Sequence, residues 1–419
     1  MKKLGLLDIL HKRGFFYQCT NEKGLSDLLS SDRNHPVYSG FDCTAATLHV
    51  GNLVQLMMMR WVQHCGYKPI ILLGGATTKI GDPSGRDETR TLRSDVDIEH
   101  NRSGIQKVIH QFVRCDGSAD GAVIVDNYAW FKDIGYIDFL REVGRHFSVN
   151  RMLTFESVKT RLDREQNLSF LEFNYLLLQA YDFVELHSGY GCRVQFGGSD
   201  QWGNIVSGVE LGRRLGIEDE LFGMTTPLIT TASGAKMGKT AKGAVWLTAE
   251  DLSPYDYWQF WRNTEDKDVG RFLRLFTELP LSDIEALESL EGNRINEAKV
   301  VLANEATAIC HGKAVAEAAC NTAQQTFAKG GYGEALPVLE LDRAALEQGI
   351  PAYKLYVKLG IAESGGAARR LIAGGGAKIQ DVKCTDAEML ITLDDLNEEG
   401  VIKLSAGKKK HGIVKVASN

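Results

Sequence analysis

The chain has 419 residues, a net charge of −6 and a hydrophobic fraction of 44%. This composition is typical of a folded globular protein and excludes a chain that is polycationic or disordered throughout. The length exceeds what one hydrophobic core supports, so we expect two to four domains. Within residues 351–419, eleven Lys or Arg stand against eight Asp or Glu, a local charge of +3, so any affinity for nucleic acid should be local to this part of the chain.

The cysteines and histidines exclude several kinds of site. The eight cysteines form no CxxC pair and the histidines show no HExxH spacing, so we expect no metal site built from protein ligands. Asp8 and His11 interrupt the first apolar run too early for a signal peptide, and no later run approaches membrane-spanning length. These features predict a cytoplasmic protein with reduced thiols and no membrane contact.

The predicted elements alternate between strands and helices. Residues 1–35 show apolar residues at helical spacing. Short apolar runs then predict buried strands, and amphipathic patterns between them predict helices, the first at residues 52–64. This alternation predicts an α/β fold with a parallel sheet, and polar clusters follow each strand at the edge where ligands bind in such sheets. The predicted strands span residues 37–41, 68–73, 122–125, 193–196 and 227–230.

Domain boundaries follow from changes in pattern. The sheet domain is predicted over residues 1–230, with a helical insertion or oligomer contact at about 130–173, a stretch too long for a simple crossover. A glycine-containing loop and linker cover 231–252, and helices without strand patterns cover 253–328. A second linker over 329–349 leads to a compact basic unit at 350–419.

The stretch from Val37 to Leu56 is the first with chemical content. A strand enters a small polar turn, which opens into a helix whose first residues include His49-Val-Gly-Asn52. Backbone N–H groups and the helix dipole can hold a phosphate at such a place, and Gly51 permits close approach. A purely structural turn remains the alternative.

A helix predicted from Ser169 to Glu185 carries a polar stripe. Tyr175, Gln179 and Asp182 stand at i, i+4 and i+7 and therefore share one face of an otherwise apolar helix. A phenol, an amide and a carboxylate in a row could bind a small ligand that has both an ammonium group and a hydroxyl. The alternative is a solvated stripe.

Two groups of cations complete the candidates. Lys236, Lys239 and Thr240 lie in a loop flanked by glycines, and this composition suits a triphosphate whose charge shifts during reaction. The alternative is an exposed basic turn. Near the carboxyl terminus a phosphate-facing patch and a solvated tail are both open interpretations. That patch consists of Arg369, Arg370, Lys378, Lys408, Lys409 and Lys410.

Taken together, these motifs resemble a known family. HVGN at 49–52 and KMGKT at 236–240 resemble the HIGH and KMSKS signatures of class I aminoacyl-tRNA synthetases. The surrounding runs are similar to those of bacterial tyrosyl-tRNA synthetases, and the terminal unit resembles their S-four-like RNA-binding domain, so the resemblance spans essentially the whole chain. The supporting runs are YSGFD (38–42), GGAT (74–77), GDPSGR (81–86), YLLLQAYD (175–182) and QFGGSDQ (195–201).

The resemblance implies a Rossmann-like catalytic domain, an α-helical anticodon-side domain and a small α+β S-four-like RNA-binding domain. It implies that Tyr38 and Asp182 bind the phenol of L-tyrosine, and that Gln201 approaches its carboxylate. The ammonium group would be held by Asp82, Tyr175 and Gln179, and the same pocket would include Asp42, Thr77 and Asn127.

For ATP, the resemblance implies ribose, adenine and phosphate contacts along the strand ends. The expected ATP-binding residues are Gly40, His49, Gly51, Asn52, Gly198, Asp200, Leu228, Ile229 and Lys239. The expected catalytic residues, which bind the γ-phosphate or stabilise the leaving pyrophosphate, are Thr44, His49, Asn52, Arg86, Arg90, Lys236, Lys239 and Thr240. Mg²⁺ would travel on the ATP phosphates, with no tightly bound cofactor. The basic patch would contact tRNA(Tyr), and Phe170 would lie in a homodimer contact.

Two residues depart from the signatures, because Asn52 replaces the last histidine of HIGH and Gly238 replaces the serine of KMSKS. Asn52 keeps an N–H donor, and both lysines of the loop remain, so the expected reaction stays the ATP-dependent activation of tyrosine and its transfer to tRNA. The alternatives are a tryptophanyl enzyme of similar fold, a nucleotidyltransferase with HxGH-like residues, and a non-catalytic RNA-binding relative.

Overall fold

The computed structural model describes residues 4–31, 34–84, 92–232, 234, 237–240, 243–328, 336–397, 400–407 and 410–417. The chain divides into two compact units. Unit 1 contains residues 1–239, 246–248 and 265–289, and unit 2 contains residues 240–245, 249–264 and 290–419. Within the described ranges, no helix is both long and apolar enough to cross a membrane.

A six-stranded sheet forms the centre of unit 1, with strand order β1-β6-β5-β2-β3-β4. The strands from β2 to β6 are parallel, as predicted, and the short edge strand β1 runs antiparallel to β6. Their bounds are β1 (Gln18–Cys19), β2 (Val37–Asp42), β3 (Pro69–Gly74), β4 (Val123–Asp126), β5 (Val194–Gly198) and β6 (Phe222–Thr226).

Two strand predictions need correction. The fifth strand is Phe222–Thr226, fully buried, and the predicted run 227–230 lies beyond its end. Pro227 cannot donate a ladder hydrogen bond, which explains why the strand ends before it. Strand β1 was missed because its two residues lie within a region that reads as helical. The sheet is therefore mixed and not purely parallel.

The strand order reverses between β2 and β5. Chain connections run outward from β2 through β3 to β4 on one side, and from β5 to β6 on the other. Strands β2 and β5 pair only at Val37–Val194 and Tyr38–Gln195, whereas β2 and β3 pair over six positions. Because the two central strands stop pairing after Tyr38, their carboxyl ends are free to hold a ligand, as is usual at such a reversal.

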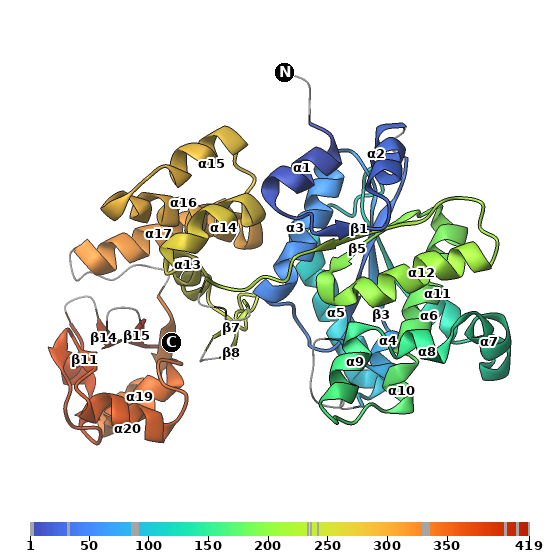
Figure 1. Cartoon of the computed structure of the whole chain (residues 1–419). Helices are drawn as coiled ribbons and strands as arrows, with labels where there is room; N and C mark the ends of the chain where they lie inside the picture. The colour runs from blue at the N-terminus through green and yellow to red at the C-terminus, as the bar shows by residue number, and fades with distance from the viewer. Residues whose placement is uncertain are drawn as a thin grey trace. The chain divides into compact units, whose positions relative to one another are not determined.

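The helices of unit 1 cover this sheet. Helix α3 packs against β2 and β3, while α12 packs against β5 and β6, and Figure 1 shows α11 and α12 running side by side. Gly191, in the left-handed conformation, ends α11 as a helix C-cap glycine does. The helices are α1 (Leu6–Arg13), α2 (Glu22–Ser31), α3 (Val50–His64), α4 (Thr77–Ile80), α5 (Asp95–Phe112), α11 (Tyr175–Tyr190) and α12 (Trp202–Arg214), with η2 (Ser199–Gln201) before α12.

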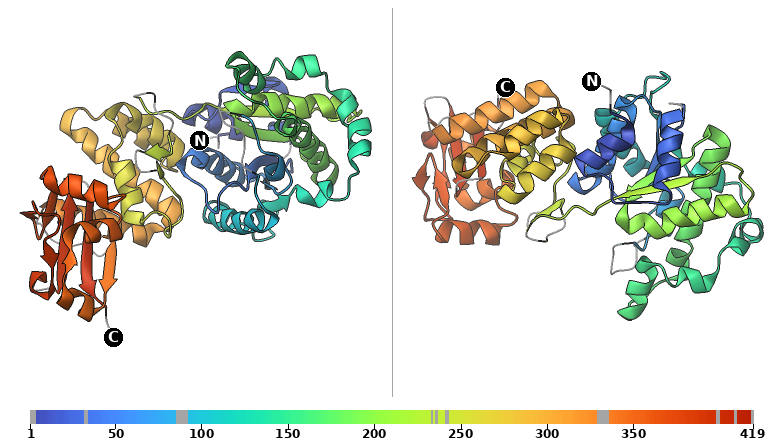
Figure 2. Two further views of the ribbon diagram at one scale, coloured as in Figure 1. Left: turned by 90° about the horizontal axis from the view of Figure 1, so that it is seen from below. Right: turned by 45° about the horizontal axis from the view of Figure 1, so that its top comes forward.

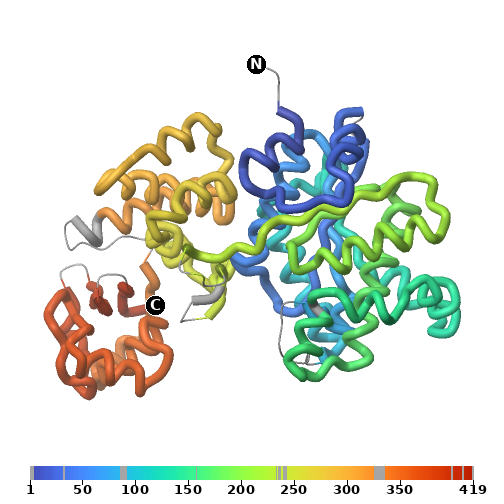
Figure 3. Tube along the Cα trace, viewed as in Figure 1, coloured from blue at the N-terminus to red at the C-terminus, as the bar shows by residue number. Residues whose placement is uncertain are grey.

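The predicted insertion is helical. Figure 3 traces it in teal and green at the periphery of unit 1. The helix predicted over 169–185 is in fact two helices that meet at Asn174, and α10 begins with a capping box between Ser169 and Glu172. The segment comprises α6 (Tyr128–Phe131), α7 (Tyr136–Glu142), η1 (Gly144–His146), α8 (Val149–Met152), α9 (Glu156–Asp163) and α10 (Phe170–Phe173).

Residues 265–289 belong to unit 1, although the sequence grouped them with the helices of 253–328. They form η3 (Asp266–Asp268), α14 (Val269–Phe276) and α15 (Leu281–Glu288). The guanidinium of Arg13, which is 4% exposed, donates to the carbonyls of Arg274, Thr277 and Leu279 at 3.0, 2.8 and 2.6 Å. These bonds satisfy the carbonyl groups at the end of α14 and tie the segment to α1.

Unit 2 begins with a helical part. Helix α13 packs against α16 and α17, and the indole N–H of Trp258 donates to Asn304 at 2.7 Å. The elements are β8 (Gly243–Ala244), α13 (Pro254–Arg262), η4 (Gly292–Arg294), α16 (Ile295–His311) and α17 (Lys313–Ala328). The short strand β7 (Lys239–Thr240) has one residue in each unit.

The rest of unit 2 is a small α/β unit with its own hydrophobic core, shown in red in Figure 2. Its five-stranded sheet has the order β12-β11-β14-β15-β9. Strand β9 and helix α18 lie in the range predicted as a linker, since β9 pairs with β15 and Leu346 is fully buried. The elements are β9 (Val338–Leu341), α18 (Arg343–Gln348), β10 (Ile350–Pro351), α19 (Ala352–Lys358), α20 (Gly365–Ala373), β11 (Ala377–Ile379), β12 (Val382–Lys383), β13 (Leu390–Ile391), η5 (Leu393–Asp395), β14 (Val401–Ala406) and β15 (Lys410–Val416).

Candidate active site

At one end of the site a buried carboxyl lies near a buried phenol. Asp182 on α11 and Tyr38 on β2 are each 1% exposed. One Asp182 oxygen accepts from Asn127 Nδ2 at 3.1 Å and the other from the indole N–H of Trp130 at 2.9 Å. The Tyr38 hydroxyl has no hydrogen-bond partner among the described residues. A buried hydroxyl in that state is costly, so this end is suited to a ligand that supplies a polar partner.

Burial also governs the protonation of this pair. It raises the pKa of Asp182 well above its ordinary value, with smaller contributions from the negative charges of Asp42 and Glu185. The hydrogen bonds from Asn127 and Trp130 oppose that rise in pKa. Burial likewise raises the pKa of Tyr38, and the nearby charge of Asp182 adds to it. A further hydrogen-bond donor, such as a neutral phenol, would therefore stabilise the ionised form of Asp182.

Asp42 collects the next group of side chains. Its two oxygens accept from Thr77 Oγ1 at 2.7 Å and from the Tyr175 hydroxyl at 3.0 Å. Asn127 Nδ2 in turn donates to Thr77 Oγ1 at 3.1 Å, which connects Asp42 to the Asp182 end. Two residues of the stripe predicted on α11, Tyr175 and Asp182, thus bond to residues at the carboxyl ends of β2 and β4 and are buried.

Asp82 is the centre of a second network. One of its oxygens accepts from the Ser84 amide at 2.9 Å and the other from Gln201 Nε2 at 2.8 Å. Asn204 Nδ2 donates to both Gln179 Oε1 at 2.9 Å and Gln201 Oε1 at 3.0 Å. The predicted residues Asp82, Gln179 and Gln201 are therefore brought together, and they present an acid and two amides at one place.

Side chains of the HVGN motif form hydrogen bonds with the backbone at the amino terminus of α3. His49 Nδ1 accepts from the Gly51 amide at 2.9 Å, and Asn52 Oδ1 accepts from the His49 amide at 3.2 Å. Since Nδ1 acts as the acceptor, the neutral His49 ring carries its proton on Nε2, where it can donate to an anion. Asn52 likewise keeps its Nδ2 donor because its oxygen caps the helix.

The glycine loop meets this helix terminus. Gly238 has φ +95°, and a Cβ built on it would lie 2.8 Å from the Gly51 nitrogen and 3.2 Å from His49 Nδ1. Met237 N donates to the carbonyl of Ile229 at 2.9 Å, which anchors the loop to the segment after β6. The departure at Gly238 thus has a physical reason, because only glycine fits both the backbone angle and the close approach.

Several expected catalytic residues lie outside the described part. Arg86, Arg90 and Lys236 are not among the described residues, and for Lys239 and Thr240 the structure describes only the backbone, as strand β7. The loop's cationic role therefore stays a prediction.

The strand ends beyond the Asp42 and Asp82 networks carry the residues expected to bind ATP. Gly40 is the one exposed residue of β2, and the Thr44 amide donates to the Asp42 carbonyl at 2.9 Å. A Cβ on Gly198 would lie 2.6 Å from Asp200 Oδ1 and 3.9 Å from Leu228 Cδ2. Leu228 is 53% exposed, which is suited to a flat apolar ligand surface at this edge.

The sequence reasoning missed three polar residues of the site. Trp130 donates to Asp182, Asn204 joins the two glutamines, and the side-chain oxygen of Gln195 is buried without a partner in the described part of the chain. Gln195 could have been suspected, because it is polar and lies in the middle of an apolar strand. Trp130 and Asn204 carry no such signal, since an indole and an asparagine are ordinary in helices.

The basic residues near the carboxyl terminus do not form one uniform patch. Arg369 lies 3.7 Å over the Tyr353 ring and pairs with Glu388 at 3.0 Å, and Lys410 Nζ donates to the Ile361 carbonyl at 2.6 Å. Arg370 and Lys378 are exposed. The predicted contributors Lys408 and Lys409 lie outside the described residues.

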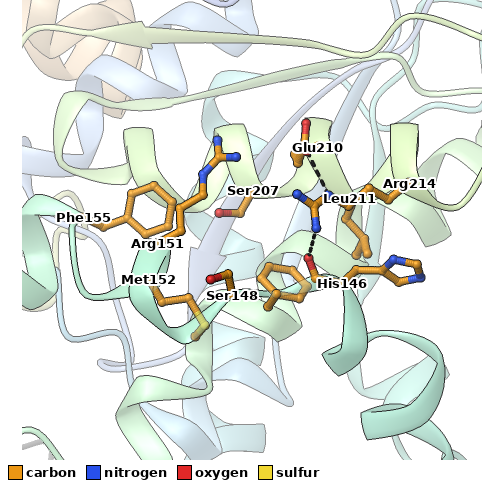
Figure 4. A pocket seen from close by; sticks show the side chains of 10 residues that line it. His146, Ser148, Arg151, Met152, Phe155, Ser207, Glu210, Leu211 and Arg214 are labelled. Carbon is orange, nitrogen blue, oxygen red and sulfur yellow. Dashed lines mark hydrogen bonds and ion pairs between the residues drawn. The ribbon is translucent and has the colours of Figure 1, made fainter.

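Unit 1 also contains a pocket apart from all predicted site residues, between α8 and α12 (Figure 4). Arg214 crosses it, with bonds to Glu210 at 2.8 Å and to the His146 carbonyl at 2.6 Å.

For metals, the described residues hold no group of three or more His, Cys, Asp or Glu that could bind an ion.

Comparison with known proteins gives a consistent result. Residues 30–328 match the family described as tRNA synthetases class I (W and Y). The chain is 54% identical over 415 residues, 99% of either chain, to "Tyrosine--tRNA ligase" of Bradyrhizobium diazoefficiens. It is 55% identical over 417 residues to the protein of the same name from Rhodospirillum rubrum, covering 99% of this chain and 98% of that one.

Among solved structures, the chain resembles a C-terminally truncated mitochondrial tyrosyl-tRNA synthetase of Aspergillus nidulans. The two share a TM-score of 0.69 and 28% sequence identity, over 78% of this chain and 95% of the other.

Proposed function

The chain belongs to the class I tRNA synthetases for tryptophan and tyrosine, and from that premise we propose how its residues divide the work of a tyrosine–tRNA ligase. In this activity, ATP activates L-tyrosine to tyrosyl-adenylate with release of pyrophosphate. The tyrosyl group then passes to the 3′ end of tRNA(Tyr).

The observation that carries the choice of amino acid is the buried pair of Tyr38 and Asp182. A phenol hydroxyl can donate to Asp182 and accept from Tyr38, so it satisfies both groups. The indole of tryptophan offers a donor alone and would leave the Tyr38 hydroxyl unpaired, which disfavours the tryptophanyl alternative. Asn127 and Trp130 hold the Asp182 carboxyl for this contact.

The α-carbon groups of the substrate are assigned to the second network. Asp82, Tyr175 and Gln179 supply oxygen atoms for the ammonium group. Gln201 supplies an N–H for the carboxylate, since its amide nitrogen has two hydrogens and Asp82 takes one. Asp42 and Thr77 orient Tyr175 and Asn127 around the same ligand.

ATP, as its magnesium complex, is assigned to the strand ends and the start of α3. The ribose is assigned to Gly40, Gly198 and Asp200, and the adenine to Leu228 and Ile229. The phosphates are assigned to the start of α3, with Thr44, His49, Gly51 and Asn52. The tyrosine carboxylate attacks the α-phosphorus in line, and it is already a nucleophile, so no general base is needed. Catalysis rests on positioning and on charge stabilisation by Arg86, Arg90, Lys236, Lys239 and Thr240.

The remaining proposals concern partners. The α/β unit at residues 336–417 is proposed to act as an S-four-like domain that contacts tRNA(Tyr), supported by the exposed Arg370 and Lys378. A homodimer through the insertion is supported by Phe170, which is 70% exposed. All eight cysteines are free, which supports the proposal that the enzyme is cytoplasmic.

One assay tests the amino-acid specificity against the alternatives. ATP–pyrophosphate exchange is measured with L-tyrosine, with L-tryptophan and without amino acid. We expect exchange with tyrosine alone. Exchange with tryptophan would favour the tryptophanyl enzyme. Exchange without any amino acid would favour a nucleotidyltransferase, and the absence of exchange would favour a non-catalytic relative.

A further inference from the structure

Asn204 lies one layer behind the proposed substrate contacts. It is on the first turn of α12, 4% exposed, and it contributes no atom to the proposed ligand contacts. Its side-chain nitrogen has two hydrogens, and both are used, at 2.9 Å to Gln179 Oε1 and at 3.0 Å to Gln201 Oε1. One asparagine therefore determines where two glutamine oxygens point.

The orientation of the Gln201 amide decides what it offers a ligand. With its oxygen on Asn204, its nitrogen faces Asp82 and donates at 2.8 Å. If the amide turned over, its oxygen would face the Asp82 carboxylate, and two acceptors would oppose each other. Asp82 itself keeps a separate bond from the Ser84 amide at 2.9 Å, so its own position does not depend on Asn204 alone.

We propose that Asn204 is a positioning residue that fixes the amide orientation of Gln201, so that the second N–H of Gln201 is held for the carboxylate of the amino-acid substrate. Gln179 is the other anchor of the asparagine, because it takes the remaining hydrogen and prevents the Asn204 amide from rotating. The inference rests on the proposed function, in which Gln201 meets the tyrosine carboxylate.

The test compares two ligands in the full-length protein. L-tyrosine has the phenol, the ammonium group and the carboxylate, whereas tyramine lacks only the carboxylate. The ratio of their affinities therefore isolates the carboxylate contact, since any damage to the phenol or ammonium contacts, or to folding, affects both. Labelled L-tyrosine is titrated directly and tyramine by competition.

Two variants of similar shape change the amide contact in different ways. Asn204→Asp replaces the donor by acceptors, and we expect the tyrosine-to-tyramine affinity ratio to fall about tenfold, which equals about 1.4 kcal/mol. Asn204→Leu removes the donor without adding charge, and we expect a fall of at least about threefold. Ser207→Ala, on the same helix, removes a hydroxyl whose bond in the described part of the chain is to the Gly203 carbonyl at 2.7 Å, and it should leave the ratio unchanged.

Kinetics give a second readout. In both Asn204 variants the KM for tyrosine in pyrophosphate exchange should rise while the KM for ATP stays near the wild-type value. An unchanged affinity ratio in Asn204→Leu, or an equal loss of both ligands in both variants, would overturn the positioning role. Failure of the wild-type protein to exchange pyrophosphate with tyrosine would instead overturn the proposed function, so the two failures are distinguishable.

Discussion

The contact between Gly238 and the start of α3 leads to a quantitative prediction for Gly238→Ala. The added methyl group would lie 2.8 Å from the Gly51 nitrogen and 3.3 Å from its Cα, at a backbone angle of φ +95°. An L-residue in the left-handed region costs roughly 1–2 kcal/mol. Forcing an extra carbon into a packed site costs a further ~1–3 kcal/mol. Both costs oppose the seating of the loop on His49 and Gly51.

A matched control separates the two costs. Gly234 lies in the same loop at φ +85°, and a Cβ built there has no atom of the described residues within 4 Å. Gly234→Ala therefore carries the backbone strain without the contact. We expect Gly238→Ala to slow tyrosine-dependent pyrophosphate exchange more than Gly234→Ala does, by about 5- to 150-fold, which corresponds to ~1–3 kcal/mol.

The assay is exchange at saturating tyrosine, together with direct measurement of tyrosine affinity. Since Gly238 lies against the end of the site that we propose to bind phosphates, the tyrosine affinity of both variants should equal that of the wild type. The reasoning fails if the two variants slow exchange equally, or if Gly238→Ala lowers tyrosine affinity and leaves exchange at saturation intact.

Other substitutions test the buried phenol site and the terminal unit. Tyr38→Phe removes a buried hydroxyl that has no hydrogen-bond partner in the described structure. Urea denaturation of the free protein should therefore show unchanged or higher stability, while the KM for tyrosine rises. Lower stability of the variant would mean that the hydroxyl has a partner. The pKa of Asp182 is raised by burial, so the folded state holds its proton more tightly than the unfolded state and stability falls as pH rises from about 4 towards that raised pKa. Asp182→Asn should lack this decrease of stability with pH. Denaturation across a pH series should therefore show the variant gaining stability relative to the wild type as pH rises. Parallel stability curves for the two proteins would contradict a raised pKa of Asp182. Deleting residues 336–419 should leave the rate of pyrophosphate exchange within about threefold of the wild type. The same deletion should slow tRNA charging at least about tenfold, because a set of phosphate contacts is lost. A charging rate equal to that of the wild type would contradict an RNA-binding role of this unit.

Much of the fold could be predicted because its signals are local. Apolar runs ending in glycine and small polar residues marked β2 to β5 within two residues of their observed bounds, since the strands of a parallel sheet covered by helices are apolar over most of their length. The polar stripe of Tyr175, Gln179 and Asp182 was predicted by helical spacing alone. The function came from several motifs in one order, which the similarity to tyrosine–tRNA ligases confirms.

Only the tertiary structure decided the contacts between segments that are distant in sequence. No local pattern connects Trp130 to Asp182, Asn204 to Gln179, or Gly238 to Gly51, because each pair meets only after the sheet has brought strand ends together. The attachment of residues 265–289 through Arg13 was missed for the same reason. Sequence periodicity records which face of an element is buried, whereas the partner of a buried polar group depends on what packs against that face.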